Sequence, residues 1–381
     1  MVASPPPVPG SAAFIHREIV QLLGLIAVVV LAFFATRAIA RTERGLVLRE
    51  AAEWYREGER QLEAGRPAAA VDALQRAVAR NRGEKQYALA LARAMALAGD
   101  RPAARTTLLA LREAAPEDIE INLQLARLAA TDGDLSEALR YYRNALYAPW
   151  PTERADERRQ LRVELIRFLL AQGAERAALT ELTALQANLP DDPAAHVLAA
   201  RLFSEAGDHR RALEQYQTAL RLDPARPDAL AGAGLAAFDL GDYRLAASYL
   251  DRAPSHLPRV GEARILANLI LANDPLAPRL GSPERARRLR AGFLHAARRL
   301  DACLAAHPDA AAGGEGESLE RDVRAFRARL RSPGVREQDT VEAGVDLMAR
   351  IEWLTAERCP PASPLDEALR LIGRQHGAAE R

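Results

Sequence analysis

Residues 193–226 show the spacing of apolar and turn residues expected of a helical hairpin, and this hairpin restricts the fold more than any other stretch. Apolar residues recur at helical spacing, stop at Gly207-Asp208, resume, and end near Pro224. The first group is Leu198, Ala199, Leu202 and Phe203, and the second is Ala212, Leu213, Tyr216, Ala219 and Leu220. One hairpin cannot bury both apolar stripes, so the pattern predicts neighbouring copies of it.

The same spacing occurs six times along the chain. A glycine stands at the break of each copy, at Gly65, Gly99, Gly133, Gly173, Gly207 and Gly241. An alanine follows each glycine by five residues, at Ala70, Ala104, Ala138, Ala178, Ala212 and Ala246. Neighbouring glycines are 34 residues apart, except for one step of 40 that contains the charged segment 151–160. We expect this segment to lengthen the preceding helix or to form a loop.

Each recurring residue type suits a helical hairpin. Glycine can end the first helix in the left-handed conformation without the steric cost of a Cβ atom. Alanine fits where the second helix comes closest to the first, because a larger side chain would push the helices apart. A proline that ends the second helix recurs at Pro116, Pro190, Pro224 and Pro258.

The copies resemble tetratricopeptide repeats, a family of helical hairpins of about 34 residues with this pattern of small residues. Trp54 stands at the tryptophan position of the family, and the resemblance covers residues 51–260 as six repeats. It implies an all-α chain whose hairpins stack into a right-handed α-solenoid and bind other proteins. The lysines and the asparagine with which chaperone-binding members hold their ligands have no counterpart here, which argues against binding of chaperone tails.

In such solenoids the first helix of each repeat lines the concave face. The ninth residue of each copy is expected there, and these residues are Glu59, Arg93, Arg127, Arg167, Arg201 and Leu235. The arginines Arg93, Arg127, Arg167 and Arg201 would form a partner-binding column for an acidic segment or a C-terminal carboxylate, which the planar guanidinium group binds well. The alternative is an ordinary solvated column whose arginines pair with nearby Glu205 or Glu164.

Residues 19–40 form an apolar segment long enough to span a bilayer of about 30 Å as a transmembrane helix. The Pro-rich residues 1–18 before it are expected to be a disordered tail. The segment is also compatible with a cleaved signal peptide, with an A-x-A cleavage site at 38–40. Arginines are more numerous after the segment than before it, so the positive-inside rule favours a cytoplasmic repeat domain, whereas the signal-like interpretation favours the periplasm.

The repeat pattern weakens after residue 260. Residues 261–308 contain two amphipathic stretches around a longer loop and are expected to form a degenerate seventh repeat. Residues 317–376 predict further short helices. These helices either cap the open apolar end of the solenoid or form a separate docking module, and capping is the simpler interpretation.

The composition gives little support for catalysis or for a nucleic-acid partner. The 52 basic residues nearly balance the 51 acidic ones, which argues against nucleic-acid binding driven by bulk charge. None of the histidines belongs to a zinc-protease motif, and no phosphate-binding or nucleophile-elbow motif is present, so we predict neither an enzyme nor a cofactor or metal site. Cys303 and Cys359 lack metal-ligand spacing, and we expect no disulfide framework and no information on the redox compartment from them.

Two functions follow from these features. The first is a membrane-tethered scaffold that binds partner proteins in the groove of the solenoid, as membrane-anchored bacterial members of the family do in envelope assembly. The second is an accessory subunit of an enzyme or secretion complex that docks through the C-terminal helices. Lys85 is the only lysine beside many arginines, which is typical of coding bias in GC-rich bacterial genomes. Together with the apolar segment 19–40, this predicts a single-pass protein of a bacterial inner membrane.

Overall fold

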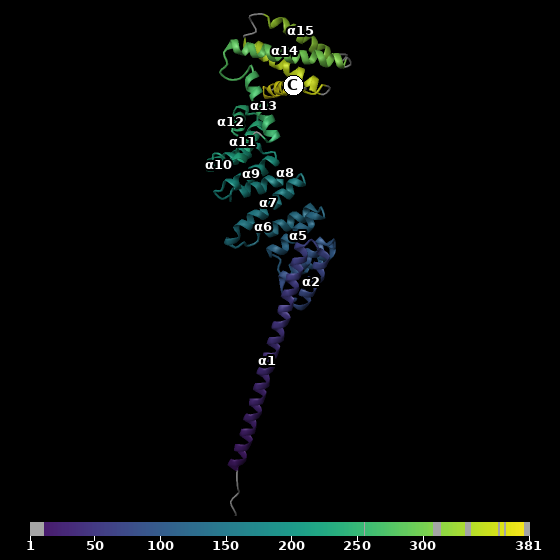
Figure 1. Ribbon diagram of the computed structural model, residues 1–381, viewed down its shortest axis with the longest axis vertical. Helices are drawn as coiled ribbons and strands as arrows, with labels where there is room; N and C mark the ends of the chain where they lie inside the picture. Colours follow the sequence, from purple (N-terminus) through teal and green to yellow (C-terminus); the bar gives the residue numbers. More distant parts are fainter. Residues whose placement is uncertain are drawn as a thin grey trace, which may run out of the picture. The chain divides into compact units, whose positions relative to one another are not determined.

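The chain divides into two compact units, Met1–Leu161 and Arg162–Arg381. The computed structural model describes residues 11–254, 256–307, 314–331, 337–356, 359–361 and 363–376. Every regular element in these described residues is a helix, and most helices are short and joined by tight turns (Figure 1). This all-α fold of stacked helical hairpins is the fold class that the sequence predicts.

Unit 1 is a series of antiparallel hairpins that follows one long helix. Its helices are α1 (Ser11–Glu63), α2 (Pro67–Arg80), α3 (Lys85–Leu97), α4 (Arg101–Ala114), α5 (Ile119–Thr131), α6 (Leu135–Tyr147) and the 3-10 helix η1 (Thr152–Arg154). Each helix from α1 to α6 contacts the next one in sequence, and α3 also contacts both α1 and α5. The first helices of successive hairpins therefore lie beside one another. Helix α7 (Ala155–Ala171) runs from unit 1 into unit 2.

Unit 2 continues with hairpins and ends in longer helices. Its helices are α8 (Glu175–Gln186), α9 (Pro193–Glu205), α10 (His209–Leu222), α11 (Pro227–Asp239), α12 (Tyr243–Leu250), α13 (Pro258–Asn273), α14 (Ser282–Ala306), α15 (Gly314–Arg329), α16 (Gln338–Ala356) and α17 (Pro364–Gln375). The first helices α9, α11 and α13 contact one another in turn, as the first helices of unit 1 do.

The repeating glycines and alanines have the roles that the sequence predicts. All six glycines have positive φ, between 67° for Gly173 and 93° for Gly99, where a Cβ atom would be strained. All six alanines, from Ala70 to Ala246, are completely buried. An aspartate after four of these glycines caps the second helix, as Asp208 does by accepting a hydrogen bond of 2.9 Å from the backbone N–H of Arg211.

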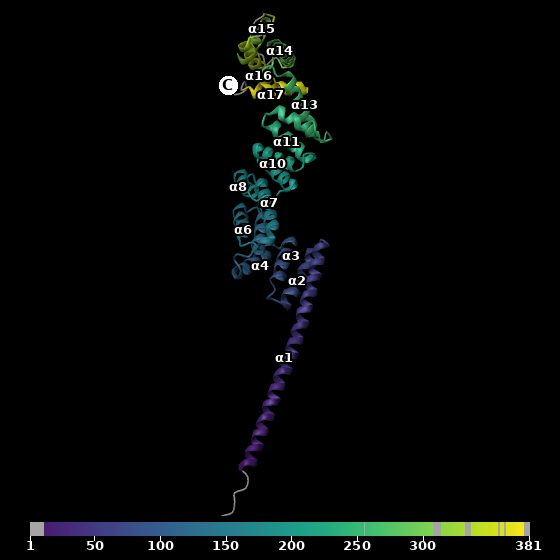
Figure 2. The ribbon, with the colours of Figure 1, turned by 90° about the vertical axis from the view of Figure 1, so that its left-hand side faces the viewer.

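Helix α1 is continuous from Ser11 to Glu63, so it begins within the segment for which the sequence predicts disorder. Residues 1–10 of that segment lie outside the described residues. Among the described helices α1 is the one long and apolar enough to cross a membrane, and none of its apolar window is buried. Figure 2 shows this part of α1 projecting from the hairpins of unit 1. An N-terminal signal sequence also contains an apolar helix that meets this criterion of length and composition.

One of the two expectations for the charged segment 151–160 was that it lengthens the preceding helix, and this expectation is wrong. Helix α6 ends at Tyr147, and the segment forms η1 and the first turns of α7 instead. Pro149, two residues after the end of α6, lacks the N–H that would bond to the carbonyl of Ala145, and so prevents continuation of the helix. The indole N–H of Trp150 donates to the carbonyl of Ala145, and the guanidinium of Arg158 donates to the carbonyl of Leu146, so both side chains satisfy the end of α6.

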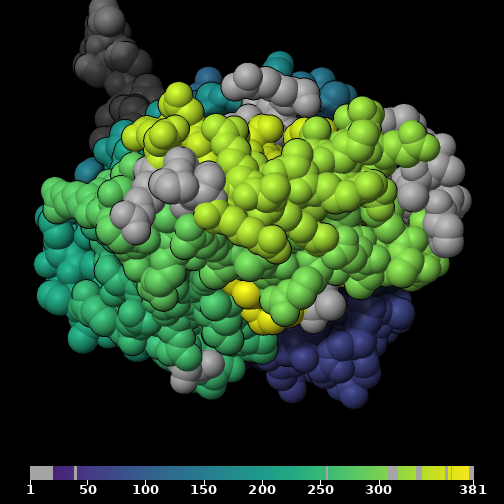
Figure 3. Space-filling view, turned by 90° about the horizontal axis from the view of Figure 1, so that it is seen from above, coloured from purple at the N-terminus to yellow at the C-terminus, as the bar shows by residue number. Residues whose placement is uncertain are grey.

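The C-terminal helices share one hydrophobic core with the last hairpins. Buried residues form this core without interruption from Leu230 on α11 to Ile372 on α17. Helix α17 contacts α13, α14 and α16, and α14 also packs against α16. The space-filling view shows the green-to-yellow C-terminal helices at the outer surface of unit 2 (Figure 3).

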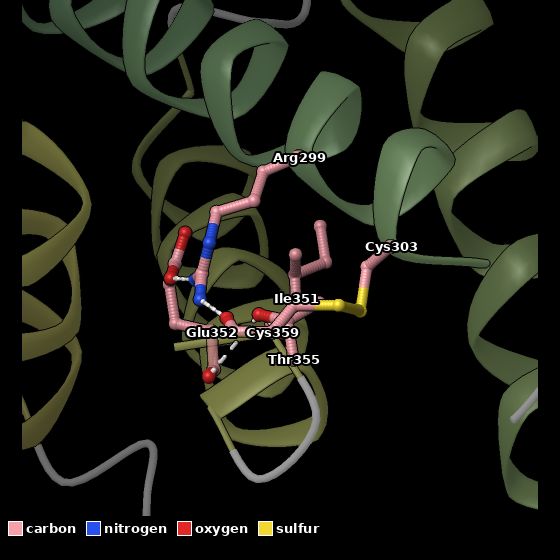
Figure 4. Close-up of a disulfide and its surroundings, with 6 residues drawn as sticks. All are labelled: Arg299, Cys303, Ile351, Glu352, Thr355 and Cys359. Carbon is pink, nitrogen blue, oxygen red and sulfur yellow. Dashed lines mark hydrogen bonds and ion pairs between the residues drawn. A yellow bond between two sulfur atoms is a disulfide. The ribbon is translucent and has the colours of Figure 1, made fainter. Parts of the chain in front are cut away.

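The two cysteines form a disulfide bond, contrary to the expectation from the sequence. Cys303 near the end of α14 is bonded to Cys359 after α16, with their Cα atoms 5.9 Å apart (Figure 4). The two residues are 56 positions apart in the sequence. The packing of α14 on α16 brings them together, which residue spacing alone does not indicate.

Candidate partner-binding face

The first helices of the hairpins carry the four arginines proposed for the partner-binding column. Arg93 lies on α3 and Arg127 on α5 of unit 1, and Arg201 lies on α9 of unit 2. Arg167 lies on α7. All four side chains are exposed, as a binding role requires. The structure brings α3 into contact with α5, while a single column of four arginines remains a prediction.

In unit 1 the arginine of α3 is paired with a carboxylate of α1. One terminal nitrogen of Arg93 donates to both carboxylate oxygens of Glu59, at 2.9 and 2.8 Å. Glu59 is the ninth residue of the preceding copy, 34 positions earlier, so the pair joins equivalent positions of adjacent hairpins. The ring of Tyr55 stacks on the ring of Tyr87 beside this pair, with centroids 4.8 Å apart. Burial raises the pKa of Tyr55, and the charge of Glu59 raises it further while Arg93 lowers it.

In unit 2 the arginine of α9 faces the beginning of α11. Arg201 lies 3.4 Å from the carboxylate of Asp228, and both side chains remain partly exposed. This partner replaces Glu205, which the sequence suggested. The buried ring of Tyr216 lies beside this pair. Burial raises the pKa of Tyr216, while the positive charge of Arg201 lowers it.

The glycines of α11 let this helix approach its neighbours closely. A Cβ atom on Gly232 would collide with the ring of Tyr216, and one on Gly234 would collide with the side chain of Leu250. These two glycines therefore serve helix packing and set the distance between α11 and the second helices α10 and α12.

These arrangements leave arginine side chains at the surface, paired with carboxylates that are also partly exposed. The side chain of Arg93 is 49% exposed and that of Arg201 is 56% exposed. An incoming carboxylate can replace Glu59 or Asp228 without opening the core, because an exposed ion pair contributes only about 0–1 kcal/mol. In each unit, therefore, a partly exposed guanidinium is available to a carboxylate from outside the chain.

The remaining polar clusters serve packing in the described part of the chain. No group of three His, Cys, Asp or Glu residues is placed there to hold a metal ion. The ring of His196 lies 2.8 Å from the amide oxygen of Gln215, which joins α9 to α10. His295 lies 2.6 Å from Asp366, and the latter also accepts from the backbone N–H of Ser363 in the capping box of α17. The sequence does not indicate this pair, because its members are 71 residues apart.

Comparison with known families agrees with the geometry of the hairpins. Models described as tetratricopeptide repeat match residues 61–128 and residues 197–259. The chain contains tetratricopeptide repeats. Trp54, at the tryptophan position of the tetratricopeptide repeat, lies under the guanidinium of Arg76, which is 4.5 Å from the ring centroid. No curated protein matches the chain.

Solved tetratricopeptide repeat structures are similar to the chain at low sequence identity. The C-terminal part of a TPR repeat-containing protein from Cytophaga hutchinsonii is 14% identical, with a TM-score of 0.42, over 62% of this chain and 93% of that one. YrrB, described as a TPR protein with an unusual peptide-binding site, is 17% identical, with a TM-score of 0.39, over 52% of this chain and 98% of that one. PilW, a type IV pilus biogenesis factor, is 18% identical, with a TM-score of 0.38, over 53% of this chain and 91% of that one.

Proposed function

We propose that this protein is a membrane-tethered scaffold that binds acidic segments of partner proteins, on the arginine-bearing face of its tetratricopeptide hairpins, in assemblies of the bacterial envelope. The observation that carries the proposal is the exposure of Arg93, Arg127, Arg167 and Arg201, one on each of four successive first helices. Arg93 and Arg127 lie on α3 and α5, which contact each other in unit 1, so neighbouring hairpins can each contribute one contact to an extended ligand. No catalytic role is part of this proposal.

Helix α1 supplies the tether in this proposal. Its large apolar side chains from Val20 to Phe34 are exposed, and water is a poor solvent for such a surface. The helix continues without a break into the first hairpin, where Ala51 is completely buried. About 14 residues at 1.5 Å per residue separate Arg37 from Ala51, so the repeats would stand about 20 Å from the apolar segment. We propose a single membrane crossing by this segment.

The proposal is tested by peptide binding to the full chain in detergent micelles. The probe is a fluorescent Glu-rich peptide, with a Gln-rich peptide of the same length as its uncharged counterpart. The triple variant R127A/R167A/R201A should bind the Glu-rich peptide about tenfold more weakly at low salt, since each exposed arginine contact contributes a few tenths of a kcal/mol or more. Equal binding by the variant and the wild type at low salt would contradict the proposal.

A matched variant distinguishes the effect of losing these particular arginines from the effect of lowering the net charge. Arg143, Arg176 and Arg210 are exposed and lie on the second helices α6, α8 and α10. The variant R143A/R176A/R210A therefore loses the same charge from the other helix of each hairpin. It should bind the Glu-rich peptide as the wild type does, and the difference between the two variants should shrink as salt is raised.

The exposed indole of Trp353 favours a second function, in which the protein is an accessory subunit that docks through its C-terminal helices. Trp353 on α16 is 55% exposed, and aromatic side chains are enriched at protein interfaces. Truncation near residue 260 would cut the core shared by α11–α17, so a surface substitution is the better test. If this function holds, W353A should abolish co-purification of a stoichiometric subunit while leaving binding of the Glu-rich peptide unchanged.

A further inference from the structure

The disulfide bond lies next to a buried ion pair, and both connect α14 to the end of α16. Cys303 and Arg299 are one turn apart on α14. The guanidinium of Arg299 pairs with Glu352 and donates to the backbone carbonyl of Cys359 (Figure 4). The backbone N–H of Cys359 in turn donates to the carbonyl of Thr355 at 2.7 Å. The position of Cys359 is therefore fixed by the disulfide and by both of its backbone polar groups.

This arrangement couples the fold of the C-terminal helices to the oxidation of the cysteines. Glu352 is completely buried, and a buried carboxylate is tolerated only while its partner and its hydrogen bonds are held in place. Breaking the disulfide would free the backbone that accepts one of the hydrogen bonds of Arg299. The core around it also includes Leu300 and Ile351, so the bond is embedded in packed structure. A disulfide placed in this way is a structural bond.

Structural disulfides persist in oxidising compartments and are rare in the cytosol, where thiol reductants keep cysteines reduced. We infer that the C-terminal helices, and with them the repeat-bearing chain, lie on the extracytoplasmic side of the membrane that α1 crosses. The apolar segment then has the orientation of a signal sequence, with its amino end in the cytoplasm. This inference does not depend on what the arginine face binds.

Formation of the bond requires an oxidant, and the extracytoplasmic compartment supplies one in the form of an oxidised protein disulfide. One cysteine thiolate attacks the disulfide of this oxidant and forms a mixed disulfide. The second cysteine then attacks the mixed disulfide, which joins Cys303 to Cys359 and releases the oxidant as a dithiol. Two thiol protons and two electrons pass from the chain to the oxidant in the whole exchange.

The arginines that follow the apolar segment favour the opposite orientation by the positive-inside rule, and they are Arg37, Arg41, Arg44, Arg49 and Arg56. The charge bias is a statistical preference that has exceptions among single-span proteins. The disulfide joins α14 to the residues after α16 beside a packed core, and such a bond persists in an oxidising compartment, so we give it more weight than the charge bias. Arg37, Arg41 and Arg44 lie on the turns of α1 at the end of the apolar segment, where they would face lipid head groups on the extracytoplasmic surface.

The test uses the full-length wild-type chain with a C-terminal tag in intact bacterial cells. Cells are quenched with acid, free thiols are blocked with N-ethylmaleimide under denaturing conditions, and the sample is reduced and labelled with maleimide-polyethylene glycol. We expect two labels per chain after reduction and none without it. In a host strain that lacks its extracytoplasmic disulfide catalyst, the doubly labelled fraction should fall severalfold. The variant C303S/C359S should take no label, and C303S should be blocked completely in the first step.

A protease added to spheroplasts completes the test. We expect the C-terminal tag to be digested, while a cytoplasmic marker protein survives. Free cysteines in the cell would overturn the inference, as would oxidised cysteines on a chain whose tag is protected from the protease. Because the labelling is done on denatured wild-type chain, the result does not depend on whether a variant folds. Loss of peptide binding in the arginine variants would leave both readouts unchanged.

Discussion

Arg299 on α14 forms an ion pair with Glu352 on α16, and the glutamate side chain is completely buried while the arginine side chain is 10% exposed. Burial lowers the pKa of Arg299, and the negative charges of Asp366 and Glu367 oppose that shift. Two charges in such a place stabilise the fold only as a pair, because each alone would be an uncompensated buried charge.

Removing one member of this pair should therefore be costly. We expect R299M and E352Q each to lower the free energy of unfolding by about 3–5 kcal/mol, as is typical when one partner of a buried pair is removed. The double variant R299M/E352Q should lose much less stability than the sum of the two single variants, since no lone charge remains buried. Urea unfolding in detergent, followed by circular dichroism, measures the free energy of unfolding of all three variants.

The exposed pair of Arg324 with Glu320 on α15 provides the control, because both side chains are open to solvent, at 68% and 39% exposed. E320Q should change the free energy of unfolding by less than about 0.5 kcal/mol. If E352Q were as mild as E320Q, or if the double variant lost as much as the two single variants together, the buried pair would not have the role described here.

Gly207 adopts a φ of 77° between α9 and α10, with no neighbouring atom in the way of a Cβ atom. We expect G207A to lower the free energy of unfolding by about 1–2 kcal/mol, because the left-handed conformation strains a residue with a Cβ atom. Gly83, between α2 and α3, does not have positive φ, so G83A should be neutral to within about 0.5 kcal/mol. Equal effects of the two substitutions in urea unfolding would show that backbone conformation is not the cause.

The helical hairpins were predictable because their determinants are local. Gly207 lies in the turn of its hairpin and Ala212 lies on the helix that follows. Because their spacing recurs six times, the sequence indicates the same backbone conformation at the turn of each hairpin. The exposed apolar surface of α1 follows from composition in the same way. Such features depend on neighbours within a few residues, which a sequence displays directly.

The interactions that differ from expectation join residues that are distant along the chain. The disulfide spans 56 residues, and the pairing of Arg201 with Asp228 spans 27. Each depends on the register with which one helix packs on another, and that register is set by the sum of many side-chain contacts. Arg201 is exposed, and the sequence leaves open which of several nearby carboxylates it meets.

Asp208 caps α10 and also accepts from the guanidinium of Arg211 at 2.6 Å. Burial alone would raise the pKa of Asp208, but the backbone N–H and the guanidinium of Arg211 lower it below its ordinary value. A depressed carboxyl pKa stabilises the fold above the unfolded pKa, near pH 4, and this contribution is lost as the pH falls through the folded pKa. D208A should therefore cost about 1 kcal/mol at neutral pH and progressively less in acid.

Asparagine in place of Asp208 separates the contribution of the helix cap from the contribution of the carboxylate charge. Asn caps helices about as well as Asp, so D208N should retain most of the stability at neutral pH. It should also lack the part of the acid sensitivity that Asp208 contributes, since its amide does not titrate. Thermal unfolding of the wild type, D208A and D208N between about pH 7 and about pH 3 measures this. If the difference in stability between D208A and the wild type stayed constant over this pH range, it would contradict the role assigned to the carboxylate.

The carboxylate of Glu59 lies 2.8 Å from the guanidinium of Arg93 in a partly exposed ion pair. Glu59 therefore competes with any acidic ligand for Arg93. E59Q should raise the affinity of the full chain for the Glu-rich peptide by about threefold, because an exposed pair is worth about 0.2–1 kcal/mol. E63Q removes the same charge from the same helix and should have a smaller effect. The gain should vanish in R93A/E59Q. Fluorescence titration at low salt measures each affinity, and a gain that persisted in R93A/E59Q would assign the effect to net charge instead of Arg93.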